Sequence, residues 1–337
     1  MKAVVLTEPG RFERIELPEA AAPGPAEALV AIRRIGVCGT DLHAFHGRQP
    51  FFSYPRILGH ELAVEVTAVG TGVTHVRAGD RAALRPAIAC GTCDTCRRGV
   101  VNACPRLTVL GAHVDGGMRE RITVPAAYLH PSTSLSLDQL ALVEPLSIGG
   151  HAVVRGAPAA GERTLVIGVG PIGLAVTAHL VAAGVRPLVA DVSAERRAFA
   201  ERWIGVETVA PGEDPAADIR ARLGGELPIL VFDATGNATS MHSAFELVAH
   251  GGRLVFVGLF QGDVTFHDPD FHRREQTLLA SRNATGADFE RSIALIEQGG
   301  ADVLAWVTDR STLADLPVAF PRWATPGSGT IKALVEV

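Results

Sequence analysis

The segment around residue 40 gathers side chains suited to metal and proton chemistry. They are Cys38, Thr40, Asp41 and His43, and a second pair, His60 and Glu61, follows soon afterwards. A thiolate, an imidazole and a carboxylate form a plausible shell for catalytic zinc, which takes three protein ligands and leaves a fourth position open. A single cysteine is more often a small buried hydrophobic residue, so the rest of the chain must decide between the two interpretations.

The other four cysteines form a C-x2-C-x2-C-x7-C pattern. They are Cys90, Cys93, Cys96 and Cys104. Disulfides are the competing explanation, but adjacent C-x2-C pairs in a chain without a secretory signal favour metal. Four thiolates close a tetrahedral structural zinc site with no open position. This interpretation uses four cysteines and leaves Cys38 for a second, catalytic zinc.

Length and composition narrow the class of protein. A chain of 337 residues is too long for one ordinary core, so we expect two domains. The net charge is −5 with no basic block, which argues against nucleic acid or an anionic membrane surface as a partner. The first residues read as a strand, and no apolar run reaches transmembrane length. We therefore expect a cytoplasmic protein.

The hydrophobic pattern changes along the chain. Up to about residue 136, short strands broken by proline and glycine predict a β-rich barrel or sandwich. Residues 137–143 and 148–153 have helical spacing, with Glu144 and Pro145 between them. Beyond Gly161, strands alternate with helices as in a doubly wound parallel sheet. The expected strands of this sheet are 164–167, 186–190, 229–232, 253–257 and 278–280, and the tail holds a helix near 287–299 and a strand at 331–336.

A G-x-G-x-x-G motif follows the first strand of the expected parallel sheet. Gly168 makes the turn, Gly170 lets the backbone approach a pyrophosphate, and Gly173 lets the following helix pack closely on the strand. Pro171 and Ile172 complete this candidate cofactor-binding turn, and proline suits a first helical turn. The start of the helix then faces the phosphates of a dinucleotide.

The acidic residue Asp191 ends the next expected strand, 18 residues after the last glycine of the motif. Its carboxylate is suited to accept hydrogen bonds from the adenosine ribose, and its charge repels a 2′-phosphate, which favours NAD. Arg196 and Arg197 leave NADP open, although a solvated helix face also explains them.

Taken together and in this order, the motifs resemble those of the zinc-dependent medium-chain alcohol dehydrogenases over essentially the full chain. The resemblance implies a GroES-like β-rich catalytic domain at residues 1–145 and 282–337, with the structural zinc lobe at about 90–104. It implies a Rossmann NAD-binding domain at 146–281, one catalytic and one structural zinc ion, and a homodimer or homotetramer.

Glu144 stands where alcohol dehydrogenases proper have a second cysteine, and this is similar to the polyol branch with sorbitol and L-threonine 3-dehydrogenases. In that branch either Glu61 or Glu144 completes the Cys38 and His60 shell, and we leave both open. The set of ligands neutralises Zn²⁺, and its oxygen makes a harder site that tolerates a vicinal diol. Asp41 resembles the partner that orients His60.

Two segments, 274–285 and 47–51, resemble dehydrogenases of L-galactonate or L-gulonate. The resemblance places a substrate-contacting arginine at Arg282, and Arg48 is a second candidate for holding a carboxylate, although a solvated arginine is the simpler interpretation. Asp309 stands where relatives often have histidine, which puts a substrate contact there in doubt.

The expected activity is NAD-linked oxidation of a secondary hydroxyl of a sugar acid or polyol to a ketone. The resemblance implies that Thr40 takes the hydroxyl proton and passes it through the cofactor ribose to His43. The alternative interpretation of His43 is a surface histidine without a catalytic role. The alternatives within enzymes are L-threonine 3-dehydrogenase-like and sorbitol dehydrogenase-like activities. A nucleic-acid-binding zinc ribbon is one alternative outside enzymes, but it needs a basic face that this chain lacks. A structural protein that has lost the chemistry is another, but it is expected to lack Cys38, His60 or Glu144, and all three are present.

Overall fold

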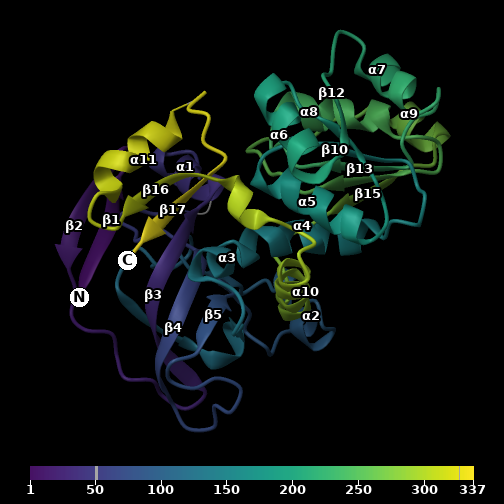
Figure 1. The fold of residues 1–337 in the computed structure, drawn as a ribbon. Helices are drawn as coiled ribbons and strands as arrows, with labels where there is room; N and C mark the ends of the chain where they lie inside the picture. The colour runs from purple at the N-terminus through teal and green to yellow at the C-terminus, as the bar shows by residue number, and fades with distance from the viewer. Residues whose placement is uncertain (50–51, 326) are drawn as a thin grey trace. The chain divides into compact units, whose positions relative to one another are not determined.

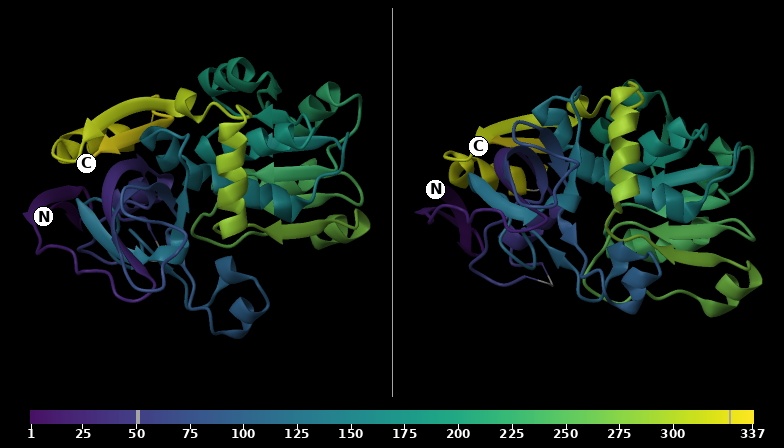
Figure 2. Two further views of the ribbon diagram at one scale, coloured as in Figure 1. Left: turned by 60° about the horizontal axis from the view of Figure 1, so that its bottom comes forward. Right: turned by 90° about the horizontal axis from the view of Figure 1, so that it is seen from below.

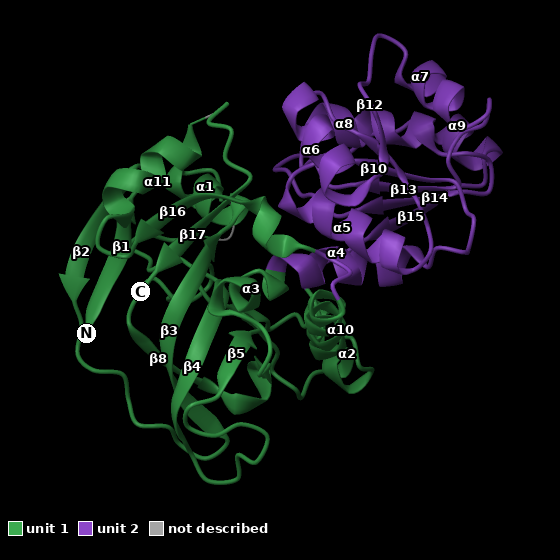
Figure 3. Ribbon diagram, viewed as in Figure 1, with its two compact units in different colours: residues 1–144, 284–298, 302–337 green, residues 145–283, 299–301 purple. Residues whose placement is uncertain are grey.

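The computed structural model describes residues 1–49, 52–325 and 327–337, and the chain divides into two compact units (Figures 1 and 3). Unit 1 comprises Met1–Glu144, Ala284–Gln298 and Asp302–Val337, and unit 2 comprises Pro145–Asn283 and Gly299–Ala301. Unit 1 therefore takes its residues from both ends of the sequence. Pro50 and Phe51, which belong to one of the segments that resemble galactonate dehydrogenases, lie outside the described residues.

Unit 1 is built on a seven-stranded sheet with the strand order β16-β17-β3-β4-β5-β9, in which β8 also pairs with β3. The strands are β3 (Glu27–Val37), β4 (Glu61–Val69), β5 (Arg81–Leu84), β8 (Arg121–Pro125), β9 (Leu129–Pro131), β16 (Val307–Thr312) and β17 (Lys332–Glu336). Two-stranded sheets pair β1 (Lys2–Glu8) with β2 (Arg11–Glu16), and β6 (Ala87–Ile88) with β7 (Thr108–Val109). The predicted β-rich region is thus present, and its sheet includes strands from the tail.

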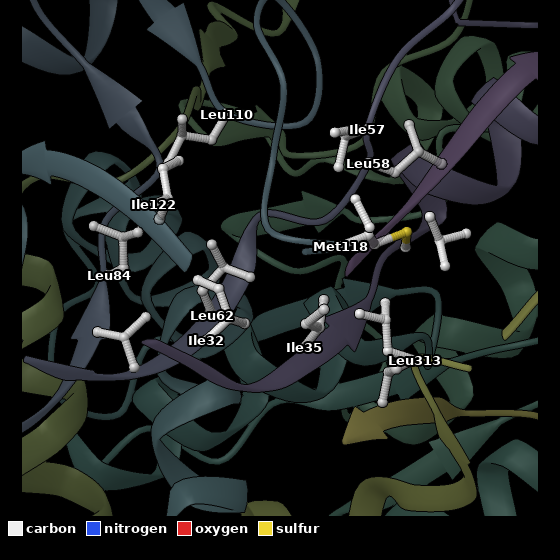
Figure 4. Packing of buried hydrophobic residues seen from close by; sticks show 14 of the residues in the cluster. Ile32, Ile35, Ile57, Leu58, Leu62, Leu84, Leu110, Met118, Ile122 and Leu313 are labelled. Carbon is white, nitrogen blue, oxygen red and sulfur yellow. The ribbon is translucent and has the colours of Figure 1, made fainter. Parts of the chain in front are cut away.

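The core of unit 1 lies against this sheet because its strands turn large apolar side chains inward. Ile32 and Ile35 of β3, Leu62 of β4 and Leu84 of β5 are at most 1% exposed and gather with Met118 (Figure 4). Residues of the tail helix α11 (Leu316–Ala324) join the same cluster. Burial of one such side chain is worth roughly 1.5–3 kcal/mol, so both ends of the sequence stabilise the framework around the candidate site.

Short helices complete unit 1. They are α1 (Gly39–Phe45), α2 (Asp94–Arg97), α3 (Leu137–Ala141), α10 (Gly286–Glu297) and the 3-10 helices η1 (Val101–Ala103), η2 (Ala126–Tyr128) and η4 (Val303–Trp306). The lobe around α2 projects from the rest of the unit (Figure 2, left). Helix α10 begins at a capping box in which Asp288 accepts a hydrogen bond from the Thr285 amide at 2.8 Å.

Unit 2 contains a six-stranded parallel sheet with the order β12-β11-β10-β13-β14-β15. Its strands are β10 (Thr164–Ile167), β11 (Leu188–Ala190), β12 (Glu207–Val209), β13 (Leu230–Asp233), β14 (Arg253–Phe256) and β15 (Thr277–Ala280). The helices are α4 (Val143–Gly156, which starts in unit 1), α5 (Pro171–Ala182), α6 (Ala194–Ile204), α7 (Pro215–Arg222), α8 (Ala238–Ser243), η3 (Ala244–Leu247) and α9 (Asp268–Arg273). Figure 2 shows the strands side by side with helices along them.

This order is that of a dinucleotide-binding Rossmann sheet, in which ligands bind beyond the carboxyl ends of the strands where the order reverses. The reversal here lies between β10 and β13. The predicted fold class, a GroES-like β-rich part with a doubly wound parallel sheet, is confirmed.

Two local features differ from the pattern-based expectation. Residues 39–45 form a helix that the sequence reading left undefined. The expected break at Glu144 and Pro145 falls inside the first turn of α4. Proline is tolerated there because the first amides of a helix have no intrahelical acceptor.

The expected domain limits of 145/146 and 281/282 lie one and two residues from the ends of the corresponding units. None of the helices in the part of the chain that the structure describes combines the length and apolar character needed to cross a membrane.

Candidate active site

Helix α1 positions the first group of candidate site residues. Cys38 is the residue just before the helix, and the Asp41 carboxylate accepts a hydrogen bond from the Cys38 amide at 2.9 Å. This bond satisfies one of the amides that a helix start leaves without a partner. It also fixes the end of β3 relative to α1, and so fixes the backbone positions from which the side chains of Cys38, Thr40 and His43 extend.

The side chains of Cys38, His60 and Glu61 meet. One sulfur, one nitrogen and one oxygen from these residues lie within 4.8 Å of one another. His60 and Glu61 are at most 7% exposed. A thiolate, an imidazole and a carboxylate at this separation match the donor set of catalytic zinc, so these residues fit the metal that the sequence predicts. Glu144, on the first turn of α4, is 8% exposed and lies outside this group of three.

Asp41 lies behind His60. Its Oδ1 atom is 3.6 Å from His60 Nδ1 and accepts a hydrogen bond from the Gly59 amide at 3.4 Å. Among the described residues His60 Nδ1 has no hydrogen-bond partner although it is buried. Burial raises the pKa of Asp41, and the charge of His60 opposes this effect. Burial lowers the pKa of His60, but Asp41 and Cys38 raise it more, so that it lies well above its usual range.

Sequence reasoning missed Lys332, which contacts the same site. Its Nζ donates to both carboxylate oxygens of Glu61, at 2.7 and 2.8 Å, and the lysine is 2% exposed. Burial lowers the pKa of Lys332, but the charge of Glu61 raises it more. A signal was present in the sequence, because lysine occurs only at positions 2 and 332 and the second lies in an apolar strand.

The carboxyl group of Glu144 is strongly perturbed. Burial raises its pKa to about 7, and the charge of His60 lowers it, while Glu61 raises it and Lys332 lowers it. A nearby cation stabilises the ionised form of a carboxyl group in this environment. Without one, the group avoids a buried charge by becoming protonated and neutral.

His43 and Arg48 lie near each other in unit 1. His43 O accepts a hydrogen bond from the Arg48 amide at 2.8 Å, and both side chains are exposed. Although His43 is exposed, partial desolvation of its ring is the main cause that lowers its pKa, followed by the charges of Arg48 and His46. Thr40 is half-buried on the first turn of α1.

The other arginine named for the substrate, Arg282, belongs to unit 2. It is exposed and follows β15 by two positions. Asp309, which stands in place of an expected histidine, accepts hydrogen bonds from Arg322 at 3.0 Å and from Trp323 at 3.2 Å. This carboxylate therefore has a structural role within unit 1.

The four cysteines of the lobe form one cluster. Cys104 Sγ lies 3.5 Å from Cys90 Sγ and 3.8 Å from Cys93 Sγ, and all four sulfurs lie within 4.8 Å of one another. Disulfide sulfurs are about 2.05 Å apart, whereas thiolates around tetrahedral zinc are about 3.8 Å apart. The cysteines are free, so their spacing fits zinc and excludes a disulfide in this structure.

Arg106 supports this cluster from outside. Its guanidinium donates to Cys90 Sγ at 3.3 Å and to the Thr92 hydroxyl at 3.0 Å, and its amide donates to Cys104 Sγ at 3.3 Å. A hydrogen bond from the Thr92 amide is the main cause that lowers the pKa of Cys90 to about 5. Both partners favour the thiolate form that a metal requires.

We predict that Arg106→Met speeds the release of structural zinc to a chelator by about tenfold, the lower end of the effect of removing an outer partner of a metal ligand. The rate is followed with a zinc-sensitive dye. Arg98→Met is the matched control, because Arg98 lies on the same lobe and pairs with Asp94 instead, at 2.9 Å. Equal release rates in the two variants would contradict a role of Arg106 at the metal.

The glycine motif forms the turn between β10 and α5. Gly168 has a φ of +96°, which favours glycine, and Gly170 immediately precedes the helix. A Cβ atom at Gly173 would lie 1.8 Å from the Gly168 carbonyl oxygen, so a side chain is excluded there. Pro171 and Ile172 occupy the first two positions of α5, whose free amides are a site for anions.

Asp191 follows β11 beside this turn. Its carboxylate accepts hydrogen bonds from the Val169 amide at 2.7 Å and from the Ser193 amide at 2.8 Å. Each oxygen keeps a further acceptor position, so ribose hydroxyls remain possible partners. Arg197 donates to the Asp191 carbonyl at 2.6 Å, and the guanidinium of Arg196 lies 3.6 Å from where a Cβ on Gly170 would stand.

Comparisons with known proteins agree with this geometry. Residues 24–134 match the family described as "Alcohol dehydrogenase GroES-like domain", and residues 171–298 match "Zinc-binding dehydrogenase". The chain is 41% identical over 318 residues to L-galactonate-5-dehydrogenase of Escherichia coli K12, with 94% of each sequence covered. It is 34% identical over 347 residues to D-altritol 5-dehydrogenase of Agrobacterium fabrum, with 100% of each covered.

Among solved structures, an alcohol dehydrogenase of Escherichia coli CFT073 complexed with NADH superposes with a TM-score of 0.92 at 28% identity. The alignment covers 100% of this chain and 99% of that one. The order of the motifs, the two clusters of side chains that could hold a metal and the extent of these matches lead to one assignment. The chain belongs to the zinc-dependent medium-chain alcohol dehydrogenases, in the branch of NAD-linked sugar-acid and polyol dehydrogenases.

Proposed function

We propose that the protein oxidises a secondary hydroxyl of an L-galactonate-like sugar acid to a ketone, with NAD as the hydride acceptor. The observation that carries the proposal is the 41% identity to an L-galactonate-5-dehydrogenase over 94% of both sequences. The sulfur, nitrogen and oxygen donors of Cys38, His60 and Glu61 support the zinc-dependent part of it. In this proposal, unit 1 is the catalytic domain and unit 2 the NAD-binding domain.

Cys38 and His60 would hold the catalytic zinc, with Glu61 and Glu144 as the candidate third ligands. When bound, zinc supplies a Lewis acid that lowers the pKa of the substrate hydroxyl. Asp41 keeps the His60 ring in place through its negative charge at 3.6 Å from Nδ1. Cys90, Cys93, Cys96 and Cys104 would hold the structural zinc.

Thr40 and His43 would carry the proton away from the substrate. Thr40 has a hydroxyl that both donates and accepts, and His43 is the exposed base on the same short helix. Because the pKa of His43 is lowered, its ring stays neutral, and able to accept a proton, to a lower pH.

We predict that Arg48→Ala moves the acidic limb of the pH profile of kcat/KM to higher pH. Removing a positive charge beside His43 raises its pKa, so the ring becomes protonated, and inactive as a base, at a higher pH. A neutral polyol is used as the substrate, so that loss of a carboxylate contact does not enter. Arg77→Ala, at an arginine whose side chain is 88% exposed and not among the charges that act on His43, is the control. An acidic limb that stays at the same pH or moves to lower pH would contradict the role of His43 as the base.

Asp191 would select NAD. We predict that Asp191→Ala raises the KM for NAD by about ten- to a hundredfold, the loss expected for a hydrogen bond to a charged group. Use of NADP should improve because the charge that repels a 2′-phosphate is gone. Asp191→Asn keeps the size of the side chain and should improve use of NADP with a smaller effect on the KM for NAD. If the parent enzyme uses NADP better than NAD, cofactor selection would instead be assigned to Arg196 and Arg197, with a preference for NADP.

The sugar-acid assignment needs a cation for the substrate carboxylate, and Arg282 and Arg48 are the candidates. Steady-state rates with NAD are measured on a panel of L-galactonate, L-gulonate, sorbitol and L-threonine. We predict the highest kcat/KM on an aldonate, and a loss of at least about tenfold in that value for Arg282→Ala. The same change should cost less on a neutral polyol. L-threonine or sorbitol as the best substrate, or an equal loss on both classes, would overturn the assignment.

Assembly and location follow as parts of the proposal. Strand β15 pairs only with β14 among the described strands, and Leu278 on it is 40% exposed. An open strand edge with apolar side chains favours pairing with a second copy, so we propose a homodimer or homotetramer. Five free cysteines, four of them in a metal-binding cluster, favour a reducing, cytoplasmic environment. The partners would be small molecules, with no role for nucleic acid or membrane.

A further inference from the structure

Lys332 stands out in composition and in position. Among the 31 lysines and arginines of the chain, only Lys2 and Lys332 are lysines. Lys332 begins β17, and its ammonium group donates to the Val37 carbonyl at 3.0 Å as well as to both oxygens of Glu61. An ammonium group has three donors, and these three acceptors match them. The compact charge suits a narrow site in a way that the planar guanidinium of arginine does not.

The pair of Lys332 and Glu61 spans three strands of the sheet. β17 pairs with β3, and β3 pairs with β4, so β3 lies between the two charged residues. Neighbouring strands are about 4.8 Å apart, so side chains on β17 and β4 start about 10 Å from each other and must meet above β3. Gly36 is the residue of β3 that pairs with Glu61 in the register, and it leaves that space open. A Cβ atom at Gly36 would lie 2.0 Å from Glu61 Oε2.

Stability alone is a weak reason for such an arrangement. Taking two charges out of water costs much of what their attraction returns, and apolar residues often serve as well. The location supplies a better reason, since Glu61 is also one of the three residues whose donor atoms gather at the candidate metal centre. The Glu61 carboxylate can therefore interact with either of two cations, the Lys332 ammonium group or a bound metal ion. By contrast, Glu144 forms no ion pair with a lysine or arginine among the described residues.

We propose that Lys332 is a positioning residue that competes with the catalytic metal for the Glu61 carboxylate, and so makes Glu144 the carboxylate that this metal centre requires. A carboxylate that already accepts two hydrogen bonds from an ammonium is a weaker donor to a second cation, because the positive charge beside it repels the metal. Gly36 contributes by leaving the space in which Glu61 reaches Lys332. The inference rests on the proposed zinc-dependent function, and it does not depend on which substrate is oxidised.

The test is the zinc content of purified full-length variants, by elemental analysis after dialysis at a fixed free zinc concentration. The parent and Glu61→Gln should hold the structural and the catalytic zinc. Glu144→Gln should hold only the structural one. Adding Lys332→Met to Glu144→Gln should restore the second zinc, since the freed Glu61 then serves as the ligand. Glu144→Gln with Lys2→Met is the matched control and should stay at one zinc, because the exposed Lys2 is the other lysine of the chain.

A second route avoids changing Lys332, whose loss leaves a buried carboxylate without its partner and can unfold the protein. Glu144→Gln with Gly36→Ala displaces Glu61 from the lysine by contact and should also restore the second zinc. Replacing the catalytic zinc by Co²⁺ gives an independent readout, since the visible spectrum of Lys332→Met should differ from that of the parent, while Lys332→Arg should resemble the parent more closely.

The proposal is overturned if Glu61→Gln, rather than Glu144→Gln, loses the second zinc. It is also overturned if neither added substitution restores zinc to a folded Glu144→Gln variant, as judged by retained structural zinc. A wrong substrate assignment would show in the rates on the substrate panel and would leave the zinc contents unchanged, so the two failures are distinguishable.

Discussion

The antiparallel pairing of β17 with β3 is the constraint on which the candidate active site depends. It places Lys332 within hydrogen-bond distance of Val37 and Glu61, from which it is separated by 295 and 271 positions in the sequence. The same strand β3 leads directly into Cys38 and α1, and on its other side it pairs with β4, which begins at Glu61. One row across three strands thus sets the positions of the thiol, the carboxylate and the ammonium group. The apolar core beneath the sheet holds these strands in register.

A second consequence of this packing is an excess of buried acid. Asp41, Glu61 and Glu144 are all at most 8% exposed; His60 lies beside Asp41, Lys332 pairs with Glu61, and the charges of both act on Glu144. Burial is the main cause that raises the pKa of Glu144 to about 7, and the nearby carboxylates of Glu61 and Asp41 raise it further against the opposing charges of His60 and Lys332. A divalent cation offsets this excess while the carboxyl groups stay ionised. The excess of buried negative charge and the sulfur, nitrogen and oxygen donors of the site therefore both favour a divalent metal ion such as zinc.

Features that depend on local spacing could be predicted from the sequence. The four-cysteine lobe and the glycine motif are short, and each residue in them has a backbone or ligand reason that holds in any fold. The parallel sheet followed from buried strands alternating with helices. Lys332 could not be found from local spacing because its partner is remote in the sequence, and the rarity of lysine in an apolar strand marked it without indicating that partner. Helix α1 was missed because its first amide is satisfied by Asp41 three residues later, with cysteine at a position where serine or aspartate is the usual signal. The choice between Glu61 and Glu144 was left open because either carboxylate serves in the branch that the chain resembles, and the pairing of Glu61 with Lys332 is not visible in the sequence.

The insertion of unit 2 into the sequence of unit 1 has a consequence for biosynthesis. During translation, Cys38, His60 and Glu61 emerge early, and the whole parallel sheet follows before residues 332–336 are made. Domains generally fold as units while the chain is still growing, so unit 2 is free to fold on the ribosome, whereas unit 1 has to wait for its last strand. Until β17 joins β3, the Glu61 carboxylate lacks its ammonium partner, and the nascent chain holds an acidic, thiol-bearing segment with unsatisfied groups. A metal ion captured before that moment would meet the Glu61 carboxylate before Lys332 reaches it.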